Sequence, residues 1–241
     1  MEKPYYRAII LVLASDNEPI YKAFKKIQET YMNENPLVKF FFVYGAGTTF
    51  ERQEYDLVYD DIKETHWAPW MTMKVIRAFE YIDSNFAYDY LIRTNLSTFW
   101  DLSLLLERLD TLPKNNCLSG RLGLFPPPFV TGTSMIISDD LIPLIIKDQQ
   151  LVNISYEKYV AEDRMISEVF TNHCNVPIIQ SDQHIVIFEN VQKFNYDEIL
   201  KIIQQRIINR HDHFRLKNMY DRQIDIEIAK LLCQVIYNKS L

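Results

Sequence analysis

The chain has 241 residues, of which 48% are hydrophobic and 24% charged, and its formal net charge at pH 7 is −6. This length suffices for one domain with a large core, and the acidic balance offers no general attraction for nucleic acid. Three cysteines lie far apart without metal-site spacing, and the first apolar run, residues 8–14, is too short to cross a membrane. Composition therefore favours a globular protein with no nucleic-acid partner, no disulfides and no transmembrane segment.

Apolar runs and amphipathic segments alternate along the first half of the chain. Residues 7–15 and 37–45 are predicted strands, and between them a helix is indicated by apolar residues at helical spacing. Further strands are predicted at residues 55–61 and 88–93, separated by a helix over residues 70–82. This alternation favours an α/β fold with parallel strands.

The second half continues the alternation less regularly. The predicted elements are a helix over residues 101–109, a Pro-rich loop at 126–128, a strand over 133–138, helices over 139–146 and 155–170, a strand over 184–189, and two helices in the tail from residue 197. We predict a single Rossmann-like α/β domain with a mixed central sheet flanked by helices and a helical C-terminal tail.

Common nucleotide-binding and hydrolase motifs are missing from the sequence. VYGAGTTF, residues 43–50, follows a predicted strand but has Phe50 where a dinucleotide fingerprint needs its third glycine. No GxxxxGK[ST], GxSxG or HExxH pattern occurs, so P-loop, serine-hydrolase and zinc-peptidase chemistry are not supported.

Two pairs of polar residues on predicted helices are candidates for a site. Lys74 and Arg77 lie three residues apart, where they form either a solvated face or the flank of a bound phosphate near the helix start. Glu162 and Asp163 begin a later helix. They are either ordinary acids stabilised by the helix dipole, or one general base and one positioning carboxylate.

A basic segment, residues 210–222, stands out in this acidic chain. If it is extended, the alternate spacing of His213, Arg215 and Lys217 puts all three on one side. The segment is then either a solvated loop or a clamp for phosphate oxygens, which guanidinium groups bind in a bidentate manner. Its two histidines lack a nearby carboxylate or cysteine partner of the usual metal-site spacing, and give little support for a metal site.

Four stretches occur in the order typical of one enzyme family. Residues 55–82, 88–100, 129–141 and 161–170 resemble the β-1,3-galactosyltransferase-like group of GT-A-fold glycosyltransferases. In that group a Leu-Thr-Leu-Lys helix, matched here by Met71-Thr72-Met73-Lys74, precedes an acidic DxD turn, a Gly-rich strand and a Glu-Asp pair. The resemblance implies transfer of a sugar from a nucleotide-sugar donor, with a UDP-sugar expected, to a glycan or other hydroxyl acceptor.

The resemblance also implies roles for individual residues. Those that would meet the base and ribose of the donor end the first strand: Ala14, Ser15 and Asp16. Lys74 would approach the diphosphate, and Gly132 and Thr133 would line the acceptor or sugar pocket. Asp163, with Glu162 beside it, matches the carboxylate that takes the proton from the acceptor hydroxyl in an inverting mechanism.

The chain departs from this group at the acidic turn. After Thr94 it has Asn95, Leu96 and Ser97, whose neutral oxygens are weak ligands for the Mn²⁺ or Mg²⁺ that neutralises a departing diphosphate. We therefore hypothesise an enzyme that needs no metal or binds one weakly, through Asn95, Ser97 or His213. The cations that would meet the charge instead are Lys74, Arg77, Arg93, His213, Arg215, Lys217 and Arg222.

These assignments divide the chain into a nucleotide-binding half, about residues 1–100, an acceptor and catalytic half, 101–190, and a helical tail, 191–241, whose basic segment closes over the donor as a lid. Two alternatives stay open. One is a GT-A-like domain that binds a sugar nucleotide or glycan without turnover, and the other is a nucleotidyltransferase, which would need Mg²⁺ on carboxylates. The sequence shows no membrane anchor, so a cytoplasmic location is expected.

Overall fold

The computed structural model describes residues 2–65, 67–123, 126–147 and 161–241. Contacts along the chain group into two compact units, each built from three segments. Unit 1 comprises Met1–Ser15, Leu37–Asn95 and Leu112–Ser181, and unit 2 comprises Asp16–Pro36, Leu96–Thr111 and Asp182–Leu241. The prediction of an α/β domain with a mixed central sheet flanked by helices and a helical C-terminal tail is confirmed.

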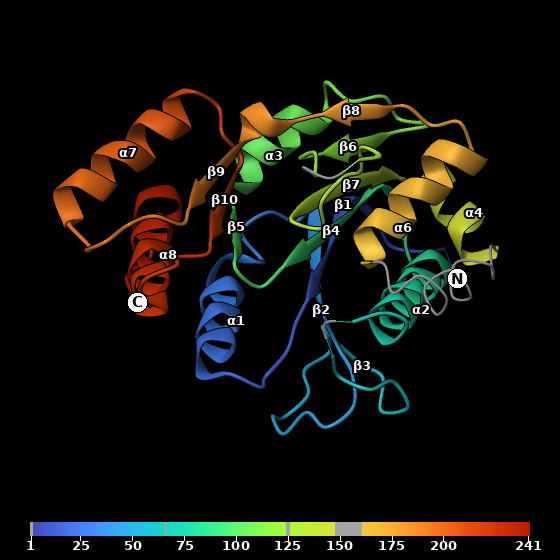
Figure 1. Ribbon diagram of the computed structural model, residues 1–241, viewed down its shortest axis with the longest axis horizontal. Coiled ribbons are helices and arrows are strands. Elements are labelled where there is room, and N and C mark those ends of the chain that lie inside the picture. Colours follow the sequence, from blue (N-terminus) through green and yellow to red (C-terminus); the bar gives the residue numbers. More distant parts are fainter. Residues whose placement is uncertain (1, 66, 124–125, 148–160) are drawn as a thin grey trace. The chain divides into compact units, whose positions relative to one another are not determined.

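Unit 1 is built on a seven-stranded sheet in the order β3-β2-β1-β4-β7-β6-β8 (Figure 1). β1 pairs in parallel with β2 and β4, whereas β7 runs antiparallel to β4 and β6, so the sheet is mixed as predicted. The strands are β1 (Tyr5–Leu13), β2 (Val38–Tyr44), β3 (Asp56–Val58), β4 (Ala87–Asn95), β6 (Leu118–Gly120), β7 (Ser134–Ser138) and β8 (Ile178–Gln180).

The helices of unit 1 are α2 (Trp70–Asn85), α4 (Ile142–Lys147) and α6 (Glu162–Glu168), with short helical turns at Asp139–Leu141 and Val169–His173. They pack on one face of the sheet and share a core with β1, β2, β4 and β7 (Figure 1). The inward side of α2 is the predicted one, because its apolar residues recur every three or four positions. Its buried apolar side chains include Met71, Val75, Ile76, Phe79 and Ile82.

β4 is longer than the sequence predicts. The polar residues Thr94 and Asn95 continue the strand because they pair with Val12 and Leu13 of β1. The turn that follows is therefore confined to Leu96 and Ser97 before β5 begins.

Unit 2 contains a three-stranded sheet in the order β5-β10-β9. Its strands are β5 (Thr98–Trp100), β9 (Ile185–Phe188) and β10 (His213–Leu216), and its helices are α1 (Pro19–Tyr31), α3 (Leu102–Leu109), α7 (Tyr196–Ile208) and α8 (Arg222–Tyr237), with a helical turn at Asp182–His184. α1 and α8 lie side by side (Figure 1). The ring of Tyr31 stacks on Tyr237 at 4.8 Å between centroids and packs on Phe99 at 4.4 Å, which joins both helices to β5.

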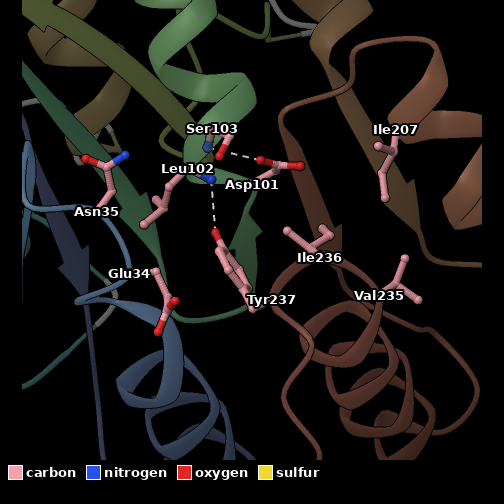
Figure 2. Close-up of a pocket in the computed structure, with 9 residues that line it drawn as sticks. All are labelled: Glu34, Asn35, Asp101, Leu102, Ser103, Ile207, Val235, Ile236 and Tyr237. Atoms are coloured by element: carbon pink, nitrogen blue, oxygen red, sulfur yellow. Dashed lines mark hydrogen bonds between the residues drawn. The ribbon is translucent and has the colours of Figure 1, made fainter.

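A pocket of about 300 Å³ opens within unit 2 (Figure 2). The segment after α1, the start of α3, and the ends of α7 and α8 form its walls. None of the helices in the described ranges combines the length and hydrophobicity needed to span a membrane.

Candidate active site

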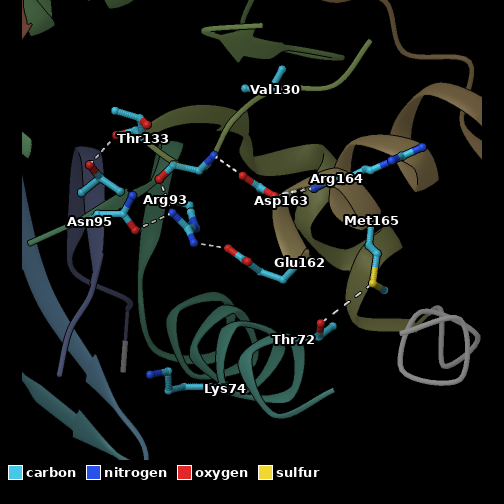
Figure 3. A network of polar contacts seen from close by, with 12 residues as sticks. Thr72, Lys74, Arg93, Asn95, Val130, Thr133, Glu162, Asp163, Arg164 and Met165 are labelled. Carbon is cyan, nitrogen blue, oxygen red and sulfur yellow. Dashed lines mark hydrogen bonds and ion pairs between the residues drawn. The ribbon is translucent and has the colours of Figure 1, made fainter. Parts of the chain in front are cut away.

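Arg93, near the carboxyl end of β4, is the centre of a buried polar network in unit 1 (Figure 3). Its guanidinium donates hydrogen bonds to Oδ1 of Asn95 at 2.9 Å, to the carbonyl oxygen of Gly132 and to the carboxylate of Glu162. Arg93 and Glu162 form an ion pair and are only 5% and 6% exposed. Since an unpaired buried charge is costly, this pair fixes the first residue of α6 against β4.

Gly132 provides the space that this guanidinium occupies. A Cβ atom at position 132 would lie 2.1 Å from Nη1 of Arg93, far inside van der Waals contact. The N–H of Gly132 in turn donates to Oδ2 of Asp163 at 2.7 Å. The glycine is therefore needed for close approach, and its backbone connects the arginine of β4 to the acids of α6.

Glu162 and Asp163 have different surroundings, as neighbouring residues on a helix must. Glu162 is buried on Arg93; burial raises the pKa of Glu162, and the positive charge of Arg93 opposes that rise. Asp163 is only partly buried, and its Oδ1 accepts the backbone N–H of Arg164 at 2.8 Å. Chemically, Glu162 is placed to hold the arginine, and Asp163 is the carboxylate with access to water.

Two hydroxyl groups fix the loop between these acids and β7. The Oγ of Ser167 on α6 accepts the N–H of Val130 at 2.9 Å. The Oγ1 of Thr94 on β4 donates to the carbonyl oxygen of Thr133 at 2.6 Å. The predicted acceptor residues Gly132 and Thr133 are therefore held beside Arg93 and Asp163 (Figure 3).

Lys74 of α2 belongs to a second buried ion pair in unit 1. Its Nζ lies 2.9 Å and 3.1 Å from the carboxylate oxygens of Glu64 and 3.5 Å from the carbonyl oxygen of Ala14. The pKa of Lys74 is lowered because the side chain is buried, and the negative charge of Glu64 only partly opposes this effect. Arg77, by contrast, pairs with Asp61 at the surface. The alternative of a solvated face is therefore wrong for Lys74, because Glu64 compensates its charge inside the packed side of α2. The phosphate-binding role of Lys74 and Arg77 stays a prediction.

Glu64 was missed by sequence reasoning, although it also holds the end of β2. Its second oxygen accepts the N–H of Gly45, directly after β2, at 2.5 Å. The only sequence signal was an acid in the loop before α2, which does not distinguish Glu64 from its neighbours. Of the residues predicted to meet the donor base, Ala14 and Ser15 are buried in unit 1, and Asp16 is the first residue of unit 2.

Asn95 and Ser97, which the resemblance places where that group has an acidic turn, are bound by arginines. Oδ1 of Asn95 accepts from Arg93 in unit 1, and Oγ of Ser97 accepts from Arg215 at 2.5 Å in unit 2. Leu96 between them is buried. An oxygen that faces a guanidinium would place a metal ion beside a like charge, so this donor set does not fit Mn²⁺ or Mg²⁺. Nor do three or more His, Cys, Asp or Glu side chains gather as a metal site anywhere in the described residues.

Within the basic segment, His213–Leu216 form β10, which pairs with β5 on one edge and β9 on the other. The alternative of a solvated loop is therefore wrong for these four residues. His213 is completely buried, with its Nδ1 bonded to the Asp212 carboxylate and its ring 4.7 Å from that of Trp100. Arg215 is half-buried and Lys217 exposed, so the three side chains do not share one surface. Their part in donor binding, and the lid, stay predictions.

This mixed α/β fold is shared with glycosyltransferases of known structure. No family model matches the chain, and no curated protein matches it either. A glycosyltransferase involved in the glycosylation of the major capsid of PBCV-1 aligns over 94% of this chain and 98% of its own, with a TM-score of 0.53 and 10% identity. At such identity the likeness concerns the fold.

A bacterial glycosyltransferase gives a similar result. The apo form of GlyE from Streptococcus pneumoniae TIGR4 aligns over 97% of this chain with a TM-score of 0.53 and 14% identity. A second GlyE structure has a TM-score of 0.52 and 13% identity. This chain spans 62% of the GlyE chain, so GlyE contains further structure beyond the shared fold.

Proposed function

We propose that this protein is a glycosyltransferase that moves a sugar from a nucleotide-sugar donor to a hydroxyl group of a glycan or other acceptor. The observation that carries the proposal is the network at the end of β4, where Arg93, Gly132, Glu162 and Asp163 are joined within a fold shared with glycosyltransferases. The donor we expect is a UDP-sugar.

Asp163 is the general base in this proposal. It takes the proton of the acceptor hydroxyl while that oxygen attacks the anomeric carbon, the bond from this carbon to the diphosphate breaks, and the configuration inverts. Each of its carboxylate oxygens accepts one backbone hydrogen bond. A second lone pair on each oxygen remains for the proton.

Arg93 stabilises the departing diphosphate in place of a metal ion. Fixed positive charge in a partly dry site is worth more than in water, and a guanidinium matches phosphate oxygens. The Nε of Arg93 is buried and makes no hydrogen bond to any described residue, so it is a donor without a partner inside the site. Glu162 positions the guanidinium.

Asp163→Asn separates catalysis from binding. We expect transfer or donor hydrolysis to fall by about 10²–10⁴ because a general base is lost. Donor-dependent thermal stabilisation of the fold should persist. Asp61→Asn, at an exposed carboxylate, is the matched control and should keep full activity.

The measurement is turnover of a panel of sugar nucleotides, with and without chelator. Equal turnover rates for wild type and Asp163→Asn would refute the role of Asp163 as the general base. Donor binding by a wild type without any turnover would favour the inactive binding domain instead. Activity that disappears in chelator and returns with Mn²⁺ would refute the role of Arg93 as the replacement for a metal.

A further inference from the structure

The pocket of unit 2 has one polar and one apolar wall (Figure 2). Glu34, Asp101 and Ser103 contribute polar groups, and Ile207, Val235 and Ile236 contribute aliphatic side chains. The residues hydrogen-bonded around Arg93 and Asp163 belong to unit 1, so this pocket is made of different residues.

Asp101 provides an unused acceptor to this pocket. Its Oδ1 caps α3 by accepting the N–H groups of Ser103 at 3.0 Å and Leu104 at 3.1 Å. The other oxygen, Oδ2, accepts no hydrogen bond from the described residues and points away from the α3 backbone (Figure 2). Asp101 is 6% exposed. A carboxylate oxygen that no protein donor occupies can accept an O–H or N–H from a ligand, and a hydrogen bond to a charged group is a strong one.

The walls are held in place before any ligand arrives. The hydroxyl of Tyr237 donates to the carbonyl oxygen of Trp100 at 2.7 Å and accepts the N–H of Leu102 at 2.9 Å. These bonds fix the end of α8 to the start of α3. A preformed pocket avoids the entropy cost of ordering its walls on binding.

The charge of the lining selects against anions. Glu34 pairs with Lys239, which does not line the pocket, and no Lys or Arg is among the described lining residues. A phosphate or carboxylate ligand would therefore contact Asp101 with no Lys or Arg in the described pocket wall, although the charge of Arg210 acts on Asp101 from outside that wall. A neutral ring that carries several hydroxyl groups suits both walls, since its O–H groups bond to carboxylate and hydroxyl oxygens and its C–H face packs on aliphatic side chains.

We propose that this pocket binds one neutral sugar unit, with Asp101 Oδ2 accepting a sugar hydroxyl and the aliphatic wall of Ile207, Val235 and Ile236 covering one face of the ring. It is a second carbohydrate site that goes beyond the transfer reaction. Its volume of about 300 Å³ accommodates a single pyranose ring. An ammonium ligand would also satisfy Asp101, but it would leave the aliphatic wall uncovered.

The test is a titration of the full chain, without donor, with neutral hexoses, pentoses, deoxyhexoses and N-acetylhexosamines. The methyl NMR signals of Ile207, Val235 and Ile236 report directly on the pocket. We expect saturable shifts with at least one sugar, weakened about tenfold in Asp101→Asn because a hydrogen bond to a charged group is lost. Asn preserves the helix cap, since its amide oxygen also accepts.

Each variant has a matched control on the same unit. Asp221 caps α8 by accepting the N–H of Gln223 at 2.8 Å, so Asp221→Asn makes the same change outside the pocket. Ile207→Trp fills the pocket and should abolish binding. Ile208→Trp, at a neighbouring side chain that is 70% exposed and does not line the pocket, should leave it unchanged.

Failure of this inference is distinguishable from failure of the proposed function. No methyl shift with any sugar, equal affinity in Asp101→Asn and wild type, or saturable shifts with ethanolamine alone would overturn it. Nucleotide-sugar binding, followed separately through donor-dependent thermal stabilisation in wild type and Asp101→Asn, tests the transferase proposal independently.

Discussion

Arg93 and Glu162 place two opposite charges where almost no water reaches them. Taking both groups out of water costs free energy, and their attraction returns it only while both are present. In the proposed function, the pair keeps the guanidinium of Arg93 at the end of β4, where the reaction needs it. The pair therefore predicts asymmetric effects of mutation on stability.

Arg93→Met should lower the free energy of unfolding by about 3–5 kcal/mol, because it leaves Glu162 buried without a partner. The double variant Arg93→Met/Glu162→Met should recover most of that loss, since neither charge remains. Urea denaturation of both single variants and the double variant measures the coupling.

Arg77→Met is the control for this cycle, because Arg77 forms a surface ion pair with Asp61 in the same unit. It should cost less than about 1 kcal/mol. If Arg77→Met and Arg93→Met lowered the free energy of unfolding equally, burial of the Arg93–Glu162 pair would not determine its contribution to stability.

The sequence could indicate some of these residues but not their partners. Glu162 and Asp163 were found as adjacent acids, and Gly132 through the resemblance. Two partners of Arg93, Gly132 and Glu162, lie 39 and 69 residues away in the chain, and those contacts depend on strand pairing that no local pattern encodes. Lys74 was grouped with Arg77 by their three-residue spacing, and only the fold reveals Glu64 as its counter-charge.

At the level of elements, long periodic segments were predictable, whereas the short strands β6 and β8 were not. β1, β2 and α2 follow from their apolar patterns, since burial of one side fixes them locally. β6 and β8 have three residues each and exist because they pair with each other and β6 with β7. For the residues of β10, an extended conformation was one of the possibilities that the sequence left open. Their position as the central strand of the β5-β10-β9 sheet depends on partners about 30 and 115 residues earlier.

β10 also begins with a buried charged cluster. Asp212 accepts from Arg108 at 3.1 Å and bonds to the ring of His213. Burial lowers the pKa of His213, although the charge of Asp212 opposes this. The pKa of Asp212 is also lowered: burial would raise it, but the positive charge and hydrogen bonds around it prevail. The folded chain therefore keeps His213 neutral where the unfolded chain protonates it.

This arrangement predicts a loss of stability in mild acid. A lowered histidine pKa contributes stability that is complete above the unfolded value, about 6.5, and is lost as pH falls toward the folded value. The free energy of unfolding should fall by up to about 1.4 kcal/mol per pH unit in that window. His213→Asn should remove this part of the slope while retaining a donor to Asp212.

Urea denaturation at a series of pH values below neutrality tests the prediction. His173→Asn, at an exposed histidine of unit 1, is the matched control and should leave the slope as in wild type. A slope that is the same in His213→Asn and wild type would mean that another group causes the acid sensitivity.

At the scale of the whole molecule, the chain alternates between two units, so neither unit is a continuous piece of sequence. The sequence suggested a tail over residues 191–241 with a lid function, and a lid is expected to be dispensable for folding. The structure of unit 2 argues for a larger role. The tail supplies the central strand of the β5-β10-β9 sheet and α8, which packs on α1.

A chain that ends at Asn190 should therefore lose the structure of unit 2. It would leave β5 and β9 without the strand between them and uncover the face of α1 that carries Phe24, Ile27 and Tyr31. Hydrogen exchange should show that the amides of α1 and β9 lose protection, since their packing is removed. A chain that ends at Asn238 loses no helix or strand and is the control.

If α1 stayed protected in the shorter chain, the tail would be an accessory segment, as a lid requires. If protection is lost, the effect of Arg215→Ala on donor binding must be measured with stability monitored in parallel, because Arg215 lies on the strand that holds unit 2 together.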